Sequence, residues 1–163
     1  MSFADRVIQF HHDLQPDWTV PAGIEVLFPY EETATIQALT AFYRKYYDDD
    51  RPRIGIFGIN PGRFGAGVTG VPFTDPIRLE ETVGIPNDFK KRQELSSVFV
   101  YEVIDAWGGP EAFFGTFYIT SLSPLGFTKN GRNYNYYDDK HIREAVTPYI
   151  IGHLGTQRAL GIS

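Results

Sequence analysis

The most informative segment of the chain is Arg53-Ile54-Gly55-Ile56-Phe57, followed at once by Gly58-Ile59-Asn60-Pro61-Gly62-Arg63-Phe64-Gly65-Ala66-Gly67-Val68-Thr69-Gly70-Val71-Pro72-Phe73. Its first part is a short apolar run of the kind that forms a strand. The second part is a loop with one carboxamide, five glycines and two phenylalanines. Ligands of open α/β sheets bind just beyond the carboxyl ends of the strands. The loop therefore predicts a site for a flat, mostly uncharged ligand that lies close to the backbone.

Two familiar phosphate-binding motifs do not fit this loop. Gly62 and Gly67 have the spacing of a P-loop, but Val68 stands where that motif needs a lysine. The dinucleotide fingerprint has the order G-x-G-x-x-G and opens a helix, whereas Val71-Pro72-Phe73 follows here. A purely structural role is the alternative, because glycine and proline commonly punctuate the chain after a strand. That alternative leaves Asn60 and the two aromatic rings unexplained.

The composition predicts a single globular domain over residues 1–163, since 42% of the residues are hydrophobic. No apolar run reaches the length of a membrane span and the N-terminus lacks signal-peptide features, so we expect a cytoplasmic protein without a membrane partner. The absence of cysteine excludes disulfides, thiol nucleophiles and cysteine-bound metals. The net charge of −5 disfavours a broad nucleic-acid surface but allows local basic patches. Candidates are Lys90-Lys91-Arg92, which solvated surface charge explains equally well, and Lys129 with Arg132.

Helices and strands alternate along the chain, which predicts an α/β fold, a three-layer α/β/α sandwich with a mainly parallel central sheet. We expect helices over residues 3–13, 31–47, 75–83, 89–107, about 139–147 and 148–160, and strands over 24–28, 53–59 and 117–122. The helix over 89–107 is expected to bury Leu95, Val98, Phe99, Val103, Ala106 and Trp107. These strands are few for such a sheet, so we expect the chain to lack a C-terminal strand.

Polar side chains follow the strand over 117–122, and a turn-rich segment over 128–133 comes next. Parallel strands end at the same edge of a sheet, so these residues should meet the loop after Phe57. The shared mouth would hold Asn60, Phe73, Ser121, Ser123, Lys129, Arg132 and Asn133. An aromatic face stacks on a planar base, an amide or a hydroxyl reads a base edge, and cations hold phosphate.

The run from Gly58 to Gly65 and the run Thr69-Gly70-Val71-Pro72-Phe73 resemble motif 1 of the single-strand-selective monofunctional uracil-DNA glycosylases. Ser123-Pro124-Leu125 and Gly131-Arg132-Asn133 resemble further motifs of that family in order and spacing, and a smaller bacterial branch looks closer still. The resemblance implies a DNA repair enzyme with the fold of those glycosylases. It would hydrolyse the N-glycosidic bond of uracil, or of a related damaged base, flipped out of DNA, with no metal or cofactor.

The resemblance also implies a role for each matching residue. Asn60 would position the attacking water at the sugar C1′, and Phe73 would stack on the flipped base. The base pocket would be lined by Ile59, Pro61, Gly62, Phe64 and Ser121. DNA would lie against Ser123, Lys129, Asn130, Gly131, Arg132 and Asn133. We expect the protein to act on DNA as a monomer.

Two departures from the family leave other interpretations open. Ser121 aligns with an asparagine that reads the base, and a hydroxyl cannot present an amide's paired donor and acceptor. The family's late His-Pro motif has no counterpart, because His11 and His12 fit a solvated helix end and His141 and His153 fit helix surfaces. A non-catalytic binder of nucleic acids or nucleobases is one alternative, and an α/β enzyme for a phosphorylated small molecule is another. The lack of a His-Pro motif also fits a C-terminally incomplete domain.

Overall fold

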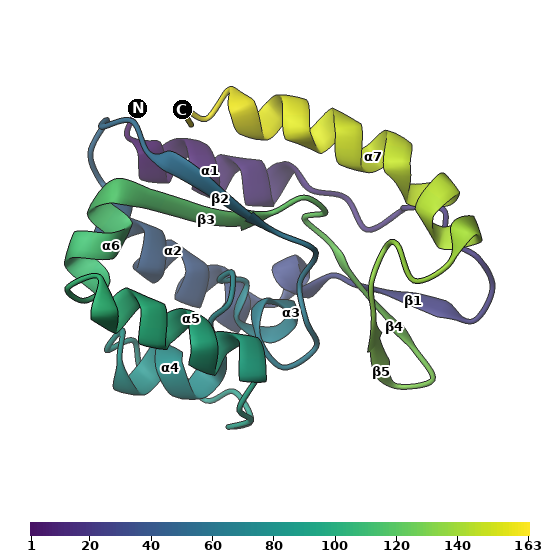
Figure 1. Cartoon of the computed structure of the whole chain (residues 1–163), viewed down its shortest axis with the longest axis horizontal. Coiled ribbons are helices and arrows are strands. Elements are labelled where there is room, and N and C mark those ends of the chain that lie inside the picture. The colour runs from purple at the N-terminus through teal and green to yellow at the C-terminus, as the bar shows by residue number, and fades with distance from the viewer.

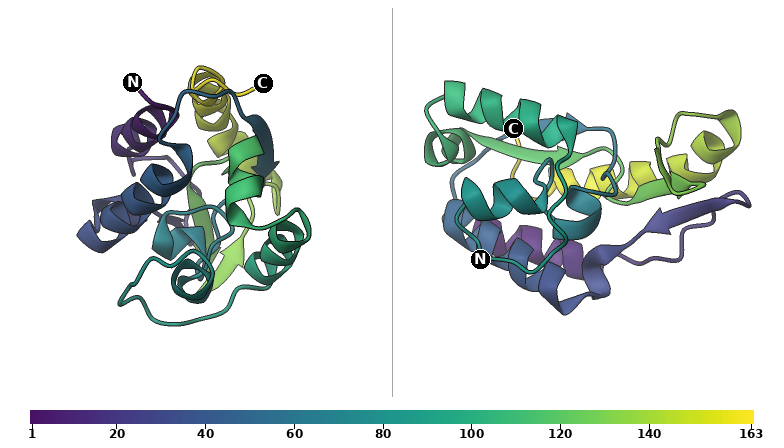
Figure 2. Two further views of the ribbon diagram at one scale, coloured as in Figure 1. Left: turned by 90° about the vertical axis from the view of Figure 1, so that its left-hand side faces the viewer. Right: turned by 90° about the horizontal axis from the view of Figure 1, so that it is seen from below.

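The computed structural model describes all residues, 1–163, and has an α/β arrangement (Figure 1). Two parallel strands, β2 (Ile54–Gly58) and β3 (Phe117–Ser121), pair from one end to the other, with Ile54 opposite Phe117 and Gly58 opposite Ser121. Helices α1 (Phe3–Asp13) and α2 (Thr33–Tyr47) lie on one side of this pair and α5 (Leu95–Ala106) on the other (Figure 2). The predicted α/β class is confirmed.

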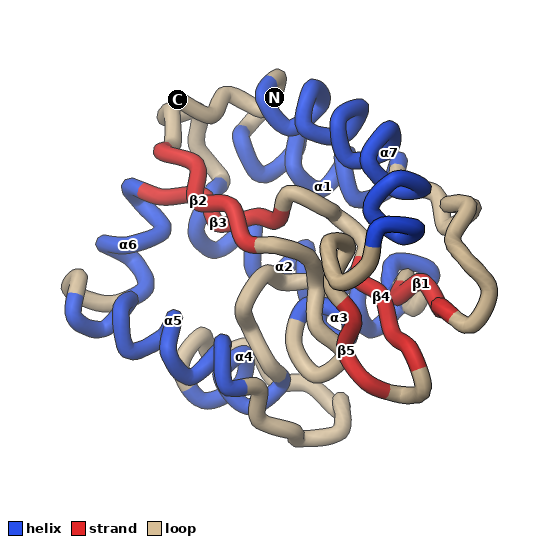
Figure 3. The backbone as a smooth tube through the Cα atoms, turned by 45° about the vertical axis from the view of Figure 1, so that its right-hand side comes forward, coloured by secondary structure: helices blue, strands red, loops and turns tan.

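A second, antiparallel sheet lies beyond the carboxyl ends of β2 and β3 (Figure 3). Its strand order is β1 (Ile24–Leu27), β4 (Gly126–Lys129) and β5 (Arg132–Tyr134). The segment expected to be turn-rich is thus a hairpin. Asn130 and Gly131 have positive φ angles of 51° and 70°, which an Asn-Gly turn between two strands requires. The strands therefore form two sheets. The two-stranded sheet of β2 and β3 is parallel, and the three-stranded sheet is antiparallel.

One core cluster includes the buried faces of α1 and α2 and extends to residues of β3, β4, α5 and the last helix. In α1, Ser2 and Asp5 form a capping box, each side chain accepting from the backbone N–H of the other. In α2, the buried stripe includes Leu39, Phe42 and Tyr43, as the 3.6-residue period predicts. Both helices agree with their predicted ranges, because their patterns are long and regular.

The later helices differ from prediction in their bounds. α7 (Lys140–Arg158) is one helix, and Pro148 lies inside it on an exposed face, where water can satisfy the carbonyl that proline leaves unpaired. α5 begins at Leu95, so residues 84–94 form an irregular loop. α4 (Pro76–Glu81) falls inside its predicted range. The short elements that prediction missed are α3 (Ala66–Thr69), α6 (Pro110–Thr116) and the 3-10 turn η1 (Pro29–Glu31).

The predicted inward face of α5 is wrong. Leu95, Phe99, Val103 and Trp107 are 82%, 65%, 41% and 54% exposed, whereas Ser97, Tyr101 and Ile104 are buried. β2 exposes Ile54, Ile56 and Phe57, and Ile162 forms a parallel bridge with Arg53 beside it. The expectation of a missing C-terminal strand stays a prediction. None of the helices has the length and apolar character that crossing a bilayer requires.

Candidate functional site

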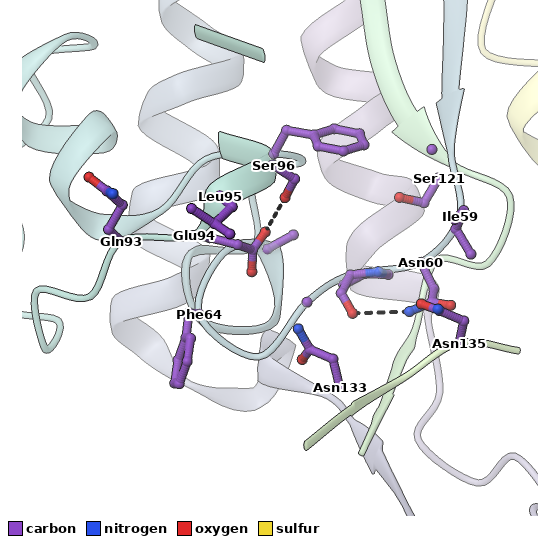
Figure 4. A pocket seen from close by; sticks show the side chains of 15 residues that line it. Ile59, Asn60, Phe64, Gln93, Glu94, Leu95, Ser96, Ser121, Asn133 and Asn135 are labelled. Carbon is purple, nitrogen blue, oxygen red and sulfur yellow. Dashed lines mark hydrogen bonds between the residues drawn. The ribbon is translucent and has the colours of Figure 1, made fainter. Parts of the chain in front are cut away.

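A cavity of about 740 Å³ opens at the carboxyl ends of β2 and β3 (Figure 4). Asn60 and Phe73 come from the loop after β2, and Ser121 ends β3. Of the seven residues expected at the shared mouth, the cavity brings together Asn60, Phe73, Ser121 and Asn133, whereas Ser123, Lys129 and Arg132 do not line it. The cavity is lined by Gly58, Ile59, Asn60, Pro61, Gly62, Phe64, Ala66, Phe73, Gln93, Glu94, Leu95, Ser96, Ser121, Asn133 and Asn135.

The carboxamide of Asn60 is held on both sides. Its Oδ1 accepts from the backbone N–H of Tyr136 at 3.2 Å, and its Nδ2 donates to the Pro61 carbonyl at 3.3 Å. The second bond lies within the loop, whereas the first reaches a segment far away in the sequence. Because the hydrogen bond with Tyr136 fixes the oxygen, the amide has one orientation at the cavity wall.

The ring of Phe73 is set in place by an unusual backbone. Its φ is 52°, a region that bulky residues rarely occupy and that often marks functional sites. The buried Thr69 hydroxyl donates to the Thr74 carbonyl at 2.7 Å and accepts from the Val71 N–H at 3.1 Å, which braces the turn. A Cβ at Gly58 would lie 2.4 Å from Phe73 Cζ, so a glycine is needed where the ring crosses the end of β2.

Ser121 is buried at the cavity wall and is supported from behind by α7. The amide of Gln157, which is fully buried, donates to the Ser121 carbonyl at 3.2 Å and accepts from the Thr120 hydroxyl at 2.6 Å. The Ser121 hydroxyl remains available to the cavity, toward which it points in Figure 4. It can supply one donor and two acceptor lone pairs to a ligand.

Glu94 is a cavity residue that sequence reasoning missed. Its Oε1 accepts from Ser96 Oγ at 2.9 Å, and its Oε2 is buried with no hydrogen-bond partner in the protein. A Cβ at Gly62 or Gly65 would come within 2.5 Å or 2.6 Å of this carboxylate, so both glycines make room for it. No sequence signal singles out Glu94, because only folding carries it to the loop. Gln93, Ser96 and Asn135 were missed for the same reason.

The β4–β5 hairpin forms the other side of the site. The residues expected to contact DNA on this hairpin are exposed: Lys129, Asn130, Gly131, Arg132 and Asn133. Asn133 Oδ1 accepts from the Arg63 N–H at 2.9 Å, and the Arg63 guanidinium donates to the Gly131 carbonyl. These bonds join the hairpin to the loop that follows β2.

Ser123 does not fit its expected role at the DNA surface. It is fully buried, and its hydroxyl donates to the Leu125 carbonyl at 2.6 Å. Its backbone N–H extends the ladder by donating to the Ile59 carbonyl at 3.0 Å. Ser123 therefore stabilises the loop that follows β3 and joins it to the loop that follows β2.

None of the four histidines lines the cavity. His11 belongs to the core and not to a solvated helix end, and burial lowers its pKa to about 4. His153 is half-buried and stacks on Trp18, so it is not a free surface residue as expected. His12 and His141 are exposed. No three His, Asp or Glu side chains are grouped to hold a metal ion.

Comparisons with known proteins agree with the geometry. A model of the Uracil DNA glycosylase superfamily matches residues 44–159, which include Asn60, Phe73 and Ser121. The crystal structure of wild-type Pedobacter heparinus SMUG2 is 49% identical in sequence with a TM-score of 0.95, over 100% of this chain and 73% of that one. No curated protein matches the chain. The chain therefore belongs to the uracil DNA glycosylase superfamily, and its likeness to SMUG2 confirms the resemblance to the single-strand-selective monofunctional group.

Proposed function

We propose that the protein hydrolyses the N-glycosidic bond of uracil, or of a related damaged base, in a nucleotide flipped out of DNA. The observation that carries this proposal is the single cavity shared by the oriented amide of Asn60, the ring of Phe73 and the hydroxyl of Ser121. An everted base needs such a pocket, with a ring to stack on and polar groups for its edge. Membership of the superfamily supports DNA as the partner.

The reaction follows from these positions. A base stacked on Phe73 presents its edge to Ser121, and its sugar faces Asn60 at the cavity mouth. Asn60 positions a water molecule whose oxygen bonds to C1′ while the bond from C1′ to the base nitrogen breaks. The electron pair leaves with the base, which takes up the proton that water releases. This scheme uses neither a metal nor a cofactor.

The test is release of free base from a uracil-containing oligonucleotide by the purified chain. We expect Asn60→Ala to lower the rate by about 100-fold or more, because one oriented polar group in a closed site has that effect. Asn87→Ala is the matched control, since Asn87 also donates to backbone carbonyls but lies outside the cavity. No release from uracil, hypoxanthine or xanthine substrates by wild-type protein would refute the proposal.

A second candidate is a nucleobase binder with the same cavity and no catalysis. It is favoured by the absence of any histidine among the cavity residues, since a leaving base gains from a strong donor. Binding without turnover, lost in Phe73→Ala and kept in the exposed control Phe99→Ala, would identify it. A single domain, a monomeric state and a cytoplasmic location remain proposals alongside either function.

A further inference from the structure

The basic residues of this acidic chain are distributed unevenly. Seven of its fifteen lysines and arginines form ion pairs with carboxylates. Of the remaining eight, five line two hollows beside the cavity: Arg63, Lys90, Arg92, Lys129 and Arg132. We call these five residues the basic rim. Cations without acidic partners, gathered at one site of a chain with net charge −5, indicate an anionic ligand.

The first hollow measures about 340 Å³ and lies next to Phe64, which also lines the main cavity. The guanidinium carbons of Arg63 and Arg92 lie 4.3 Å and 4.9 Å from the centroid of the Phe64 ring. Two cation–π contacts thus hold the two guanidinium groups on one ring. Lys90 completes the wall of this hollow. Its two guanidinium groups are held around an aromatic face, and none of the three cations forms an ion pair with a carboxylate.

The second hollow measures about 480 Å³ and lies on the hairpin. It contains Lys129 and Arg132, and it shares Asn133 with the main cavity. Figure 4 places both shared residues, Phe64 and Asn133, at the same cavity. Arg63 connects the hollows, because it contacts Phe64 and donates to the Gly131 carbonyl. Arg63 therefore links the two parts of the basic rim, each of which shares one residue with the cavity.

We propose that Arg63, Lys90 and Arg92 form a phosphate site, and that the whole basic rim binds one DNA strand on both sides of the everted nucleotide. This inference rests on the proposed function. It adds a second DNA contact, at Arg63, Lys90 and Arg92, to the contact expected at the hairpin. The chemistry is that of phosphodiesters, which guanidinium and ammonium groups bind without regard to sequence. Phe64 adds an apolar surface against which a sugar or a neighbouring base can lie.

The first experiment measures binding of a fluorescent uracil-containing single strand at several salt concentrations, with Asn60→Ala in every protein to prevent turnover. We expect the added pair Lys90→Gln and Arg92→Gln to weaken binding and to lower the salt slope by about 1.4, the value for two lost phosphate contacts on a single strand. Lys45→Gln with Arg158→Gln is the matched control, because it removes one lysine and one arginine that form no ion pair and lie at exposed positions outside both hollows. An unchanged slope in the first variant, or an equal change in the control, would overturn the phosphate site.

The second experiment determines which hollow binds the DNA on the 5′ side of uracil and which binds it on the 3′ side. One oligonucleotide is cut to a single nucleotide on the 5′ side of uracil, and another on the 3′ side. We expect one truncation to abolish the effect of Lys90→Gln with Arg92→Gln, and the other to abolish that of Lys129→Gln with Arg132→Gln. Loss of both effects with the same truncation, or of neither, would contradict a strand that spans the cavity.

These outcomes are separable from the proposed function itself. If wild-type protein releases no base while the rim variants still weaken binding, the glycosylase proposal fails and the phosphate site stands. If base is released but the rim variants bind DNA like wild type, the phosphate site fails and the glycosylase proposal stands. Should inorganic phosphate or a mononucleotide alone raise the melting temperature of wild type but not of the Lys90 and Arg92 variant, with strand binding unchanged, the site would be one for small anions and the inference would be wrong.

Discussion

The cavity has two walls that are built in opposite ways. The wall from Gly58 to Thr74 is braced by buried threonine hydroxyls and holds Phe73 in a strained backbone conformation. The hairpin wall is exposed and presents Lys129, Arg132 and Asn133 to solvent. Precise placement of a base needs the first kind of wall, because a small shift of a contacting group is costly to catalysis. Attraction of a charged strand needs only the second kind.

We expect the largest effect from lowering the pH, which should reduce the stability of the core that supports the buried wall. His11 packs between Tyr30 and Tyr43, and Tyr30 donates to the Pro124 carbonyl beside Ser123. Burial lowers the pKa of His11 from 6.5 to about 4, so the unfolded chain takes up its proton first as the pH falls. Stability should therefore be full above pH 6.5 and decline by about 3 kcal/mol down to pH 4.

Urea unfolding between pH 7 and pH 4 measures this decline. His11→Phe should remove most of it, while the exposed His12→Gln should leave it in place. Partial burial lowers the pKa of His153 too, so its contribution has the same sign. Asp49, whose pKa Arg53 holds below its usual range, acts at lower pH and does not mask the effect. A flat profile across this range would show that His11 is not buried as a neutral ring.

The next effect concerns the crossing of Phe73 over β2. Gly58→Ala places a methyl group against the ring, which must move, and we expect kcat/KM to fall by about 100-fold. Gly152→Ala is the matched control, because a Cβ at this position would meet nothing within 4 Å. Gly152 lies in α7, where alanine favours the helix. Similar activity in both variants would mean that the ring position does not matter to the reaction.

A smaller effect should follow from removing one hydroxyl of the buried wall. Thr69→Val keeps the shape of the side chain but leaves the Val71 N–H and the Thr74 carbonyl without their partner, at a cost of about 1–3 kcal/mol. Activity should fall with stability, because the turn that carries Phe73 loosens. Thr156→Val, on the exposed face of α7, should change neither. Thermal unfolding and base release, measured on the same samples, decide the point.

The smallest effect should come from the hairpin turn. Gly131 and Gly152 both have open space at Cβ, but only Gly131 has a positive φ, of 70°. Gly131→Ala should therefore destabilise the protein by about 1 kcal/mol, whereas Gly152→Ala should be neutral or stabilising. Base release at saturating substrate should change little in either variant. A large loss of kcat in Gly131→Ala would show that the hairpin also places reacting groups.

Local sequence patterns predicted the elements whose partners lie near in sequence or whose hydrophobic pattern continues over many residues. The stripe of α2 was predictable because burial follows its 3.6-residue period, and the strand before Gly58 was predictable from its apolar residues although most of them are exposed. The Asn130-Gly131 dipeptide is also a hairpin signal, although the predicted feature there is only a turn-rich segment. α5 was mispredicted because two of its faces are apolar, and only packing selects the one with Tyr101 and Ile104.

That an amide and a ring share one loop after a strand is evident from the residues alone, since Asn60 and Phe73 are separated by a short, glycine-rich run. Their surroundings exist only in the folded chain. Tyr136 orients Asn60, Gln157 supports Ser121, and Glu94 enters beside Gly62, each across many residues of chain. The physical reason is that such contacts depend on how elements pack, and packing joins residues that no local pattern connects.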